Sequence, residues 1–171
     1  MVYTPSIQNN QMVWKGSRQV EDLTDAVARE MSADQWMTLT YWYRMLPAEG
    51  LPARNRFDPL EVWSAVARIV LFEIVGQGED VIFRLVGEDF EMRAGSGLRG
   101  QRFSEIGNPA QVPPTLAIVE EMYRDGRPIL SAGSLATLDR GYVGYRRLAM
   151  PFAEEDGGPA RYILCCYAFD R

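Results

Sequence analysis

Apolar side chains recur at helical spacing near the start of the chain and in short strand-like runs later. Between residues 20 and 31 they fall three or four positions apart, which predicts an amphipathic helix. Ser32 and Gln35 then have the spacing of a capping box, so a second helix is expected to begin there and to end at Pro47. The first twenty residues are polar and irregular, and a short strand near residues 12–14 is the one element expected in them.

A linker rich in proline and glycine follows the second helix. It predicts an N-terminal arm with a helical extension over residues 1–50 and a second domain over residues 51–171. This domain opens with a helix start, because the carboxylate of Asp58 can accept a hydrogen bond from a free backbone N–H and Pro59 suits the first helical position. Glu61 stands where a capping box places its second side chain.

The second domain has the predicted order strand, strand, three helices and three strands. The expected strands are residues 67–75, 81–86, 128–138, 142–152 and 161–169, and the expected helices are residues 88–94, 103–106 and 113–123. An antiparallel sheet needs one face covered, so these helices are expected to cover it and to leave a pocket between the two layers. The predicted fold class is α+β, with a five-stranded antiparallel sheet and helices on one face.

Charge and hydropathy narrow the classes of partner. The net charge of −5 disfavours nucleic acid and anionic membrane surfaces, since both require clustered Lys and Arg. Arg146 and Arg147 form the only adjacent basic pair, and they are interpreted as solvated strand residues. The chain has no apolar run of membrane-spanning length and no apolar signal-peptide core in its first thirty residues, which predicts a cytoplasmic protein.

The absence of histidine excludes several chemistries. A Ser–His or Cys–His nucleophile pair, a His-ligated haem and a His-rich zinc site all require that residue. Cys165 and Cys166 are neighbours in an expected strand, where consecutive side chains point to opposite faces, so they are expected to be reduced thiols. Acidic clusters at residues 79–80, 88–89 and 154–156 fall in expected turns and match no calcium-loop spacing, so no metal site is expected.

Seven short motifs in order resemble a known family. They are Tyr41-Trp42, Leu51-Pro-Ala-Arg54, Phe57-Asp-Pro59, Phe83-Arg-Leu-Val-Gly87, Gly100, Gly126-Arg-Pro128 and the segment from Tyr145 to Pro151. Together they are similar to a bacterial family of stand-alone PAS-domain proteins with an N-terminal Tyr-Trp helix and an Arg-Leu-Val-Gly strand. The likeness covers residues 36–168, although Glu88 stands where the family usually has threonine.

The resemblance implies a PAS fold and a non-catalytic sensory or regulatory module in cytoplasmic signalling. Such a module would bind a small apolar or amphipathic ligand, a protein partner, or both. A photoactive flavin requires a cysteine on a central helix, and the cysteines here lie on the last expected strand, so that cofactor is not expected.

Ten side chains are expected to face the space between the helices and the sheet. They are Phe83, Leu85, Phe90, Met92, Phe103, Leu116, Met122, Tyr123, Tyr145 and Met150. Two interpretations stay open, a hydrophobic core and a pocket wall, and the Met and aromatic content favours an adaptable site. In a pocket, the two tyrosines could supply polar contacts.

The second helix and Arg84 each allow more than one interpretation. The helix carries Trp36, Leu39, Trp42 and Tyr43, which either cover the core or form a homodimer interface. Arg84 is expected to extend to solvent or to pair with Glu73 across the hairpin, and contact with a ligand carboxylate is a further alternative.

Two rival functions come from other classes. A cone-shaped α+β isomerase or hydratase would need a buried carboxylate, Asp89 or Glu121, beside Tyr145. The second rival function is that of a purely structural homodimer, whose interface would be the aromatic second helix.

Overall fold

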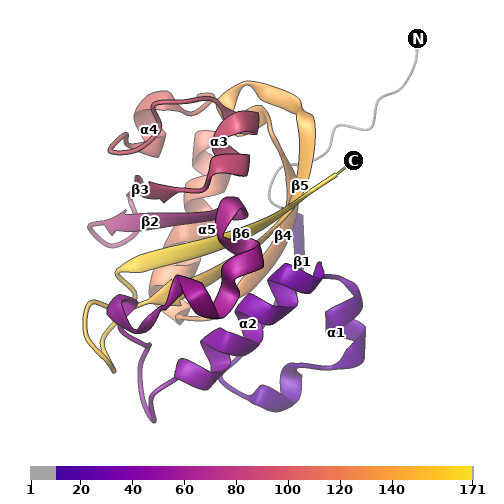
Figure 1. Cartoon of the computed structure of the whole chain (residues 1–171). Helices are drawn as coiled ribbons and strands as arrows, with labels where there is room; N and C mark the ends of the chain where they lie inside the picture. The colour runs from indigo at the N-terminus through magenta and orange to yellow at the C-terminus, as the bar shows by residue number, and fades with distance from the viewer. Residues whose placement is uncertain (1–10, 171) are drawn as a thin grey trace.

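The computed structural model describes residues 11–170, apart from the side chains of residues 141 and 142. A single open sheet forms its centre (Figure 1). The strands are β1 (Gln11–Lys15), β2 (Ile69–Val75), β3 (Asp80–Val86), β4 (Ile129–Leu135), β5 (Arg140–Phe152) and β6 (Tyr162–Phe169). Their order is β1-β4-β5-β6-β2-β3, and every neighbouring pair is antiparallel. The predicted α+β fold is confirmed, and the expected N-terminal strand adds a sixth member beside β4.

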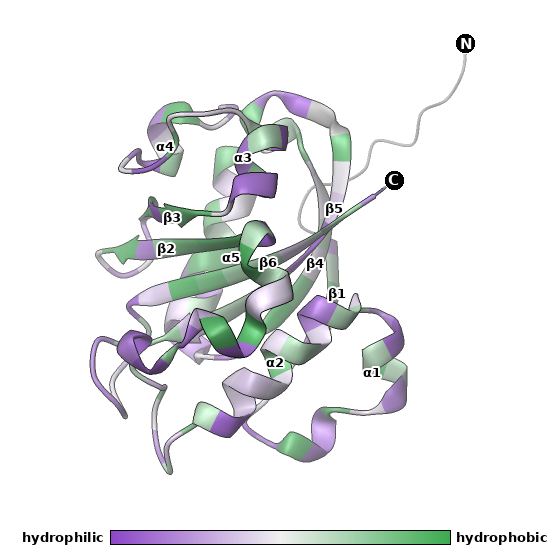
Figure 2. Ribbon diagram, viewed as in Figure 1, coloured by the Kyte–Doolittle hydropathy of each residue, from purple (hydrophilic) through white to green (hydrophobic). Residues whose placement is uncertain are grey.

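Helices lie on both sides of this sheet. They are α1 (Asp25–Arg29), α2 (Ala33–Met45), α3 (Glu88–Ala94), α4 (Phe103–Ile106), α5 (Val112–Asp125) and the 3₁₀ helix η3 (Pro59–Arg68), with short 3₁₀ turns at Val20–Asp22, Arg54–Arg56 and Ala136–Leu138. In Figure 1, α2 and η3 lie in front of the sheet and α5 lies behind it. Figure 2 shows that the strands carry mainly hydrophobic residues, whereas α2 and α5 carry both kinds. In the described residues, none of the helices has the length and apolar character needed to span a membrane.

The N-terminal helices differ from the sequence prediction in one respect. The single helix expected over residues 20–31 is interrupted, because the hydroxyl of Thr24 accepts a hydrogen bond from Val27 N (3.3 Å) and starts α1 there. The capping box of Ser32 and Gln35 is confirmed at the start of α2.

The aromatic stripe of α2 packs on the chain's own sheet. Leu39, Trp42 and Tyr43 are buried, and the indole N–H of Trp42 donates to the carbonyl of Pro151 at 2.8 Å. These three side chains therefore cover the core and are not available as the predicted dimer surface. Trp36 is half-buried.

The start of η3 follows the prediction in part. The carboxylate of Asp58 accepts from Leu60 N at 3.0 Å, as expected of a helix cap. The N–H of Asp58 donates to the hydroxyl of Tyr41 (3.0 Å), so that hydroxyl occupies the place expected for Glu61. The strand predicted over residues 67–75 begins two residues later, at Ile69, because η3 continues to Arg68.

A β-bulge in the first hairpin alters which side chains share a face. Leu71 lies opposite Leu85 and Phe72 lies opposite Phe83, so Arg84 has no opposite residue in β2. An extra residue reverses the alternation of a strand. The predicted pair between Arg84 and Glu73 is confirmed, with Nε and Oε2 2.5 Å apart.

Candidate functional site

An interior cavity lies between the sheet and helices α3, α4 and α5. Strands β2, β3, β5 and β6 supply one wall, and Phe90, Phe103 and Met122 supply side chains from the three helices. Its free volume is about 50 Å³. One water molecule needs about 10–15 Å³ on this measure, so the cavity has room for about four water-sized groups.

Half of the ten predicted lining residues meet at this cavity. They are Phe83, Phe90, Phe103, Met122 and Tyr145. Sequence reasoning missed other lining side chains, chiefly Phe72, Thr115, Thr137, Arg147, Cys165 and Tyr167. Aromatic rings dominate one end, where Tyr167 lies 5.2 Å from Tyr145 and 4.7 Å from Phe90 between ring centroids.

Two of the ten predicted lining residues, Leu85 and Met150, lie on strands but on the face of the sheet that points away from the cavity. Leu85 is 49% exposed, because the bulge at Arg84 turns it away from the face of Phe83. Met150 pairs with Leu164, while its neighbour Ala149 lines the cavity, so alternation places Met150 toward α2.

Three more of the predicted lining residues, Met92, Leu116 and Tyr123, lie on helices but not on the helix faces that point into the cavity. Met92 is 80% exposed, since it lies two positions from Phe90 and so on the far side of α3. Leu116 and Tyr123 are half-buried and lie beside the side chains with which α5 faces the cavity.

The main polar group of the cavity is the guanidinium of Arg147, which is only 8% exposed. It lies 3.2 Å from the hydroxyl of Ser131 and makes a long contact of 3.5 Å with that of Tyr145. The guanidinium carbon also lies 5.6 Å from the centroid of the Tyr145 ring, within cation–π range.

Arg146 and Arg147 face opposite sides of β5. Arg146 donates to the backbone carbonyl and to a carboxylate oxygen of Glu30, both at 2.6 Å. The interpretation of both arginines as solvated is therefore wrong for Arg147. The sequence contained the information needed to place Arg147 correctly. It lies two residues after Tyr145 on the same strand, so both side chains point to the same face, and Tyr145 was expected to point inward.

The two cysteines are free and buried. Cys165 lines the cavity, and Cys166 occupies the opposite face of β6. Burial raises the pKa of each thiol to about 12. Both groups are therefore protonated near neutral pH, which makes them poor nucleophiles.

Gln35 connects α2 to the strands that line the cavity. Its side chain is fully buried, and its amide N donates to the carbonyls of Arg146 and Cys166, both at 3.0 Å. The next residue of β5, Arg147, lines the cavity on the other face, as does the residue before Cys166. Gln35 therefore joins the first turn of α2 to two strands whose opposite faces line the cavity.

The carboxylate–tyrosine site of the rival isomerase is not assembled. Asp89 pairs with Arg93 at 3.0 Å, and Glu121 pairs with Lys15 at 2.5 Å. The buried acid Asp80 accepts hydrogen bonds from Ser104 N and Val81 N. Over residues 11–170, no group of three or more acidic or thiol side chains is placed to hold a metal ion.

Comparison with known proteins gives one match. A family model described as a PAS domain matches residues 30–167, which is most of the chain and includes α2 and strands β2 to β5. No curated protein and no solved structure matches. The division of the chain at residue 50 stays a prediction.

Proposed function

Because the chain belongs to the PAS-domain family, we propose that it is a sensory module whose interior cavity binds a small ligand and whose α2 reports occupancy. The observation that carries the proposal is the buried guanidinium of Arg147 among aromatic and aliphatic walls. Mostly apolar walls with a few placed polar groups are typical of ligand sites.

The cavity favours a small amphipathic carboxylate. A carboxylate oxygen is a stronger acceptor for a guanidinium than the neutral hydroxyls of Ser131 and Tyr145 that now lie beside it. A volume of about 50 Å³ suits an acid with a short alkyl group, whose methyl end would contact the rings of Phe83 and Phe90.

Signal output is proposed to leave through α2. The amide of Gln35 contacts the backbone directly behind the cavity, so a ligand that moves β5 or β6 changes the hydrogen bonds that fix the start of this helix. A protein partner that recognises this change, and a homodimer, stay predictions.

Titration of the protein with formate, acetate, propionate and butyrate, followed by NMR, tests the ligand proposal. The best small ligands gain about 1.5 kcal/mol per non-hydrogen atom, which limits acetate to a dissociation constant no tighter than about 40 μM. We expect one of these acids to bind in the micromolar to millimolar range. Arg147→Met should weaken binding at least tenfold, since it removes a charge-assisted hydrogen bond worth about 1.5–3 kcal/mol.

Arg146→Met is the matched control, because it removes the neighbouring guanidinium from the opposite face. Binding of these acids that is equal in both variants and in the wild type would refute the assignment of Arg147. If none of the acids shifts any resonance, the proposed ligand class is wrong.

A further inference from the structure

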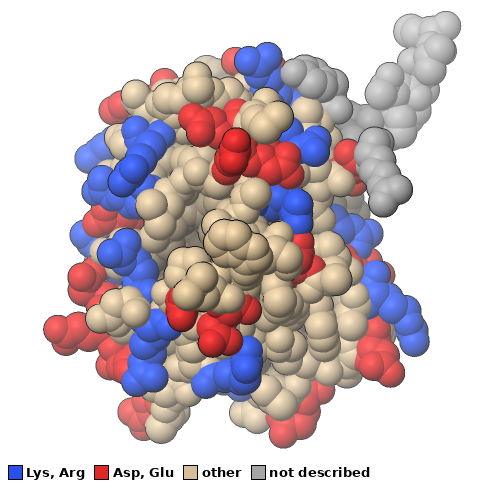
Figure 3. Space-filling view, in the orientation of Figure 1, with Lys and Arg blue, Asp and Glu red and all other residues tan. Residues whose placement is uncertain are grey.

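A larger hollow lies on the face of the sheet opposite the cavity. It has a volume of about 610 Å³ and is bounded by the 3₁₀ turn Arg54–Arg56, by η3, by Glu91 of α3 and by the loop that follows α3. Figure 3 shows it near the centre of this face, between uncharged side chains and beside a row of Lys and Arg. We call it the groove.

The groove has an apolar floor that the chain's own helices leave open. Helices α2 and η3 pack against one another and against β6, and the surface between η3 and the β2–β3 hairpin stays open as the groove. The floor consists of Ile69 and Leu71 from β2, Leu85 and Val86 from β3, and Leu164 from β6. The bulge at Arg84 contributes directly, because it turns Leu85 toward the groove.

The apolar surface continues along η3. Pro59 and Val66 line the groove, and Trp63 lies three residues before Val66, one 3₁₀ turn away on the same side of the part of η3 that follows the kink at Val62. Trp63 is 73% exposed. An exposed apolar patch joined to a concave floor marks a binding surface more often than a chance arrangement.

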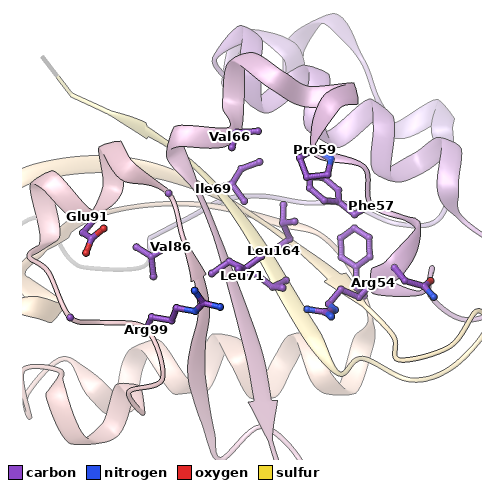
Figure 4. A pocket seen from close by; sticks show the side chains of 15 residues that line it. Arg54, Phe57, Pro59, Val66, Ile69, Leu71, Val86, Glu91, Arg99 and Leu164 are labelled. Carbon is purple, nitrogen blue, oxygen red and sulfur yellow. The ribbon is translucent and has the colours of Figure 1, made fainter.

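Two arginines supply the positive charge of the groove. In Figure 4 the side chains of Arg54 and Arg99 reach in from different ends, and both head groups lie near Leu71. Within residues 11–170, neither forms a salt bridge; the guanidinium of Arg54 rests over the ring of Tyr162 at 5.0 Å. By contrast, Arg84 and Arg146 of the sheet each form an ion pair, with Glu73 and Glu30 respectively.

We propose that the groove binds a free anionic amphiphile, a carboxylic acid with a medium-length alkyl chain. The volume lies within the roughly 300–1,000 Å³ typical of small-molecule sites. The carboxylate would lie between Arg54 and Arg99, and the alkyl chain would cover Leu71, Leu85 and Leu164. Glu91 lines the α3 end of the groove (Figure 4), where its charge repels a carboxylate and so favours this orientation.

This site is separate from the cavity of the proposed function. The floor residues Leu71 and Leu164 are strand neighbours of Phe72 and Cys165, which line the cavity on the other face. A ligand in the groove would therefore contact the same two strands, β2 and β6, from the opposite side. The two sites are distinguished by their cations, Arg147 for the cavity and the pair Arg54 and Arg99 for the groove.

Isothermal titration with hexanoate, octanoate and decanoate, each below its micelle concentration, tests the proposal. Burial of one methylene contributes about 0.8 kcal/mol, so affinity should rise about fourfold for each added CH₂ until the floor is covered. Decanol, which has the same chain without the charge, should bind at least tenfold more weakly than decanoate.

Paired variants locate the site. Leu85→Glu places a carboxylate on the floor and should weaken decanoate binding at least tenfold, whereas Met92→Glu, an equally polar change at an exposed position of α3 outside the groove, should leave it unchanged. Replacement of both Arg54 and Arg99 by Gln should weaken binding about tenfold, and Arg124→Gln on α5 should have no effect. Circular dichroism checks that each variant is folded.

Arg147→Met should leave decanoate binding intact, so failure of the cavity proposal and failure of this one are distinguishable. Equal binding by all groove variants would show non-specific association and would overturn the proposal. So would binding to vesicles of anionic phospholipid without binding to the free acid. Sedimentation could instead show a dimer that disappears in Leu85→Glu, in a protein that does not bind decanoate. The groove would then be a contact between copies of the chain, and the proposal would also be overturned.

Discussion

Gln35→Leu tests how firmly α2 is attached to the strands behind the cavity. The substitution keeps the volume and the apolar contacts of this buried position but removes three hydrogen bonds. At a net contribution of about 0.5–1.5 kcal/mol each, their loss should lower the free energy of unfolding by about 3 kcal/mol. For a chain of this length that corresponds to a melting temperature about 6–12 °C lower.

Urea unfolding followed by circular dichroism measures this change. Gln101→Leu is the matched control, because its side chain is exposed, and it should stay within about 0.5 kcal/mol of the wild type. Gln35→Glu adds a second arm: a carboxylate facing two carbonyl oxygens cannot donate, so this variant should be at least as unstable as Gln35→Leu at pH 7. The pKa of this new acid should be raised in the folded state, so its deficit relative to the wild type should shrink as the pH falls toward about 4.

If Gln35→Leu has the same free energy of unfolding as the control Gln101→Leu, the reasoning is refuted. It would mean that the amide contributes nothing to the seating of α2, and the proposed route from cavity to helix would lose its physical basis.

Two further predictions concern the sheet. Gly87→Ala should lower the free energy of unfolding by about 1–3 kcal/mol in urea titrations, because a Cβ there would lie 2.4 Å from the carbonyl oxygen of Ala67; a neutral result would contradict this tight contact. Burial raises the pKa of Cys165 and Cys166 from 9.0 to about 12, so their contribution to stability is complete below pH 9 and is lost as the pH rises toward 12. Between these values each thiol should lower the free energy of unfolding by about 1.4 kcal/mol per pH unit, and replacing both by Ala should make the measured pH dependence less steep, with the buried Tyr43 and Tyr167 accounting for the slope that is left.

The fold was predictable because its signals are local. The capping box at Ser32, the helix cap at Asp58 and the apolar runs of the strands depend on neighbouring residues, and the structure confirms each of them. The one broken helix has an equally local cause, the cap at Thr24, which competes with continued helical spacing.

The candidate site was predictable only where the pattern continued without interruption. The alternation of side chains along a strand correctly placed Phe83 and Tyr145 at the cavity. Because Arg147 lies two residues after Tyr145 on the same strand, the same alternation would have placed it there too. Leu85 was misplaced because one inserted residue, Arg84, shifts the register, and no residue type marks a bulge of this kind.

The groove could not be predicted because it depends on tertiary position. Its arginines are far apart in sequence, because Arg54 lies in the 3₁₀ turn Arg54–Arg56 and Arg99 lies in the loop after α3, and only the tertiary fold brings both to one groove. The aromatic residues of α2 illustrate the same limit: their composition fits an interface as well as a core, and only packing decides between the two.

The most direct test of the central claim follows the side-chain amide of Gln35 by NMR while propionate is added to the wild-type protein. The account predicts that the Arg147 Nε–H resonance and the Gln35 amide resonances shift together, with one dissociation constant, and that the Gln35 amide resonances do not shift in Arg147→Met. A shift at Arg147 with an unchanged Gln35 amide would contradict the link to α2. An unchanged Arg147 resonance at saturating propionate would contradict ligand binding in the cavity itself.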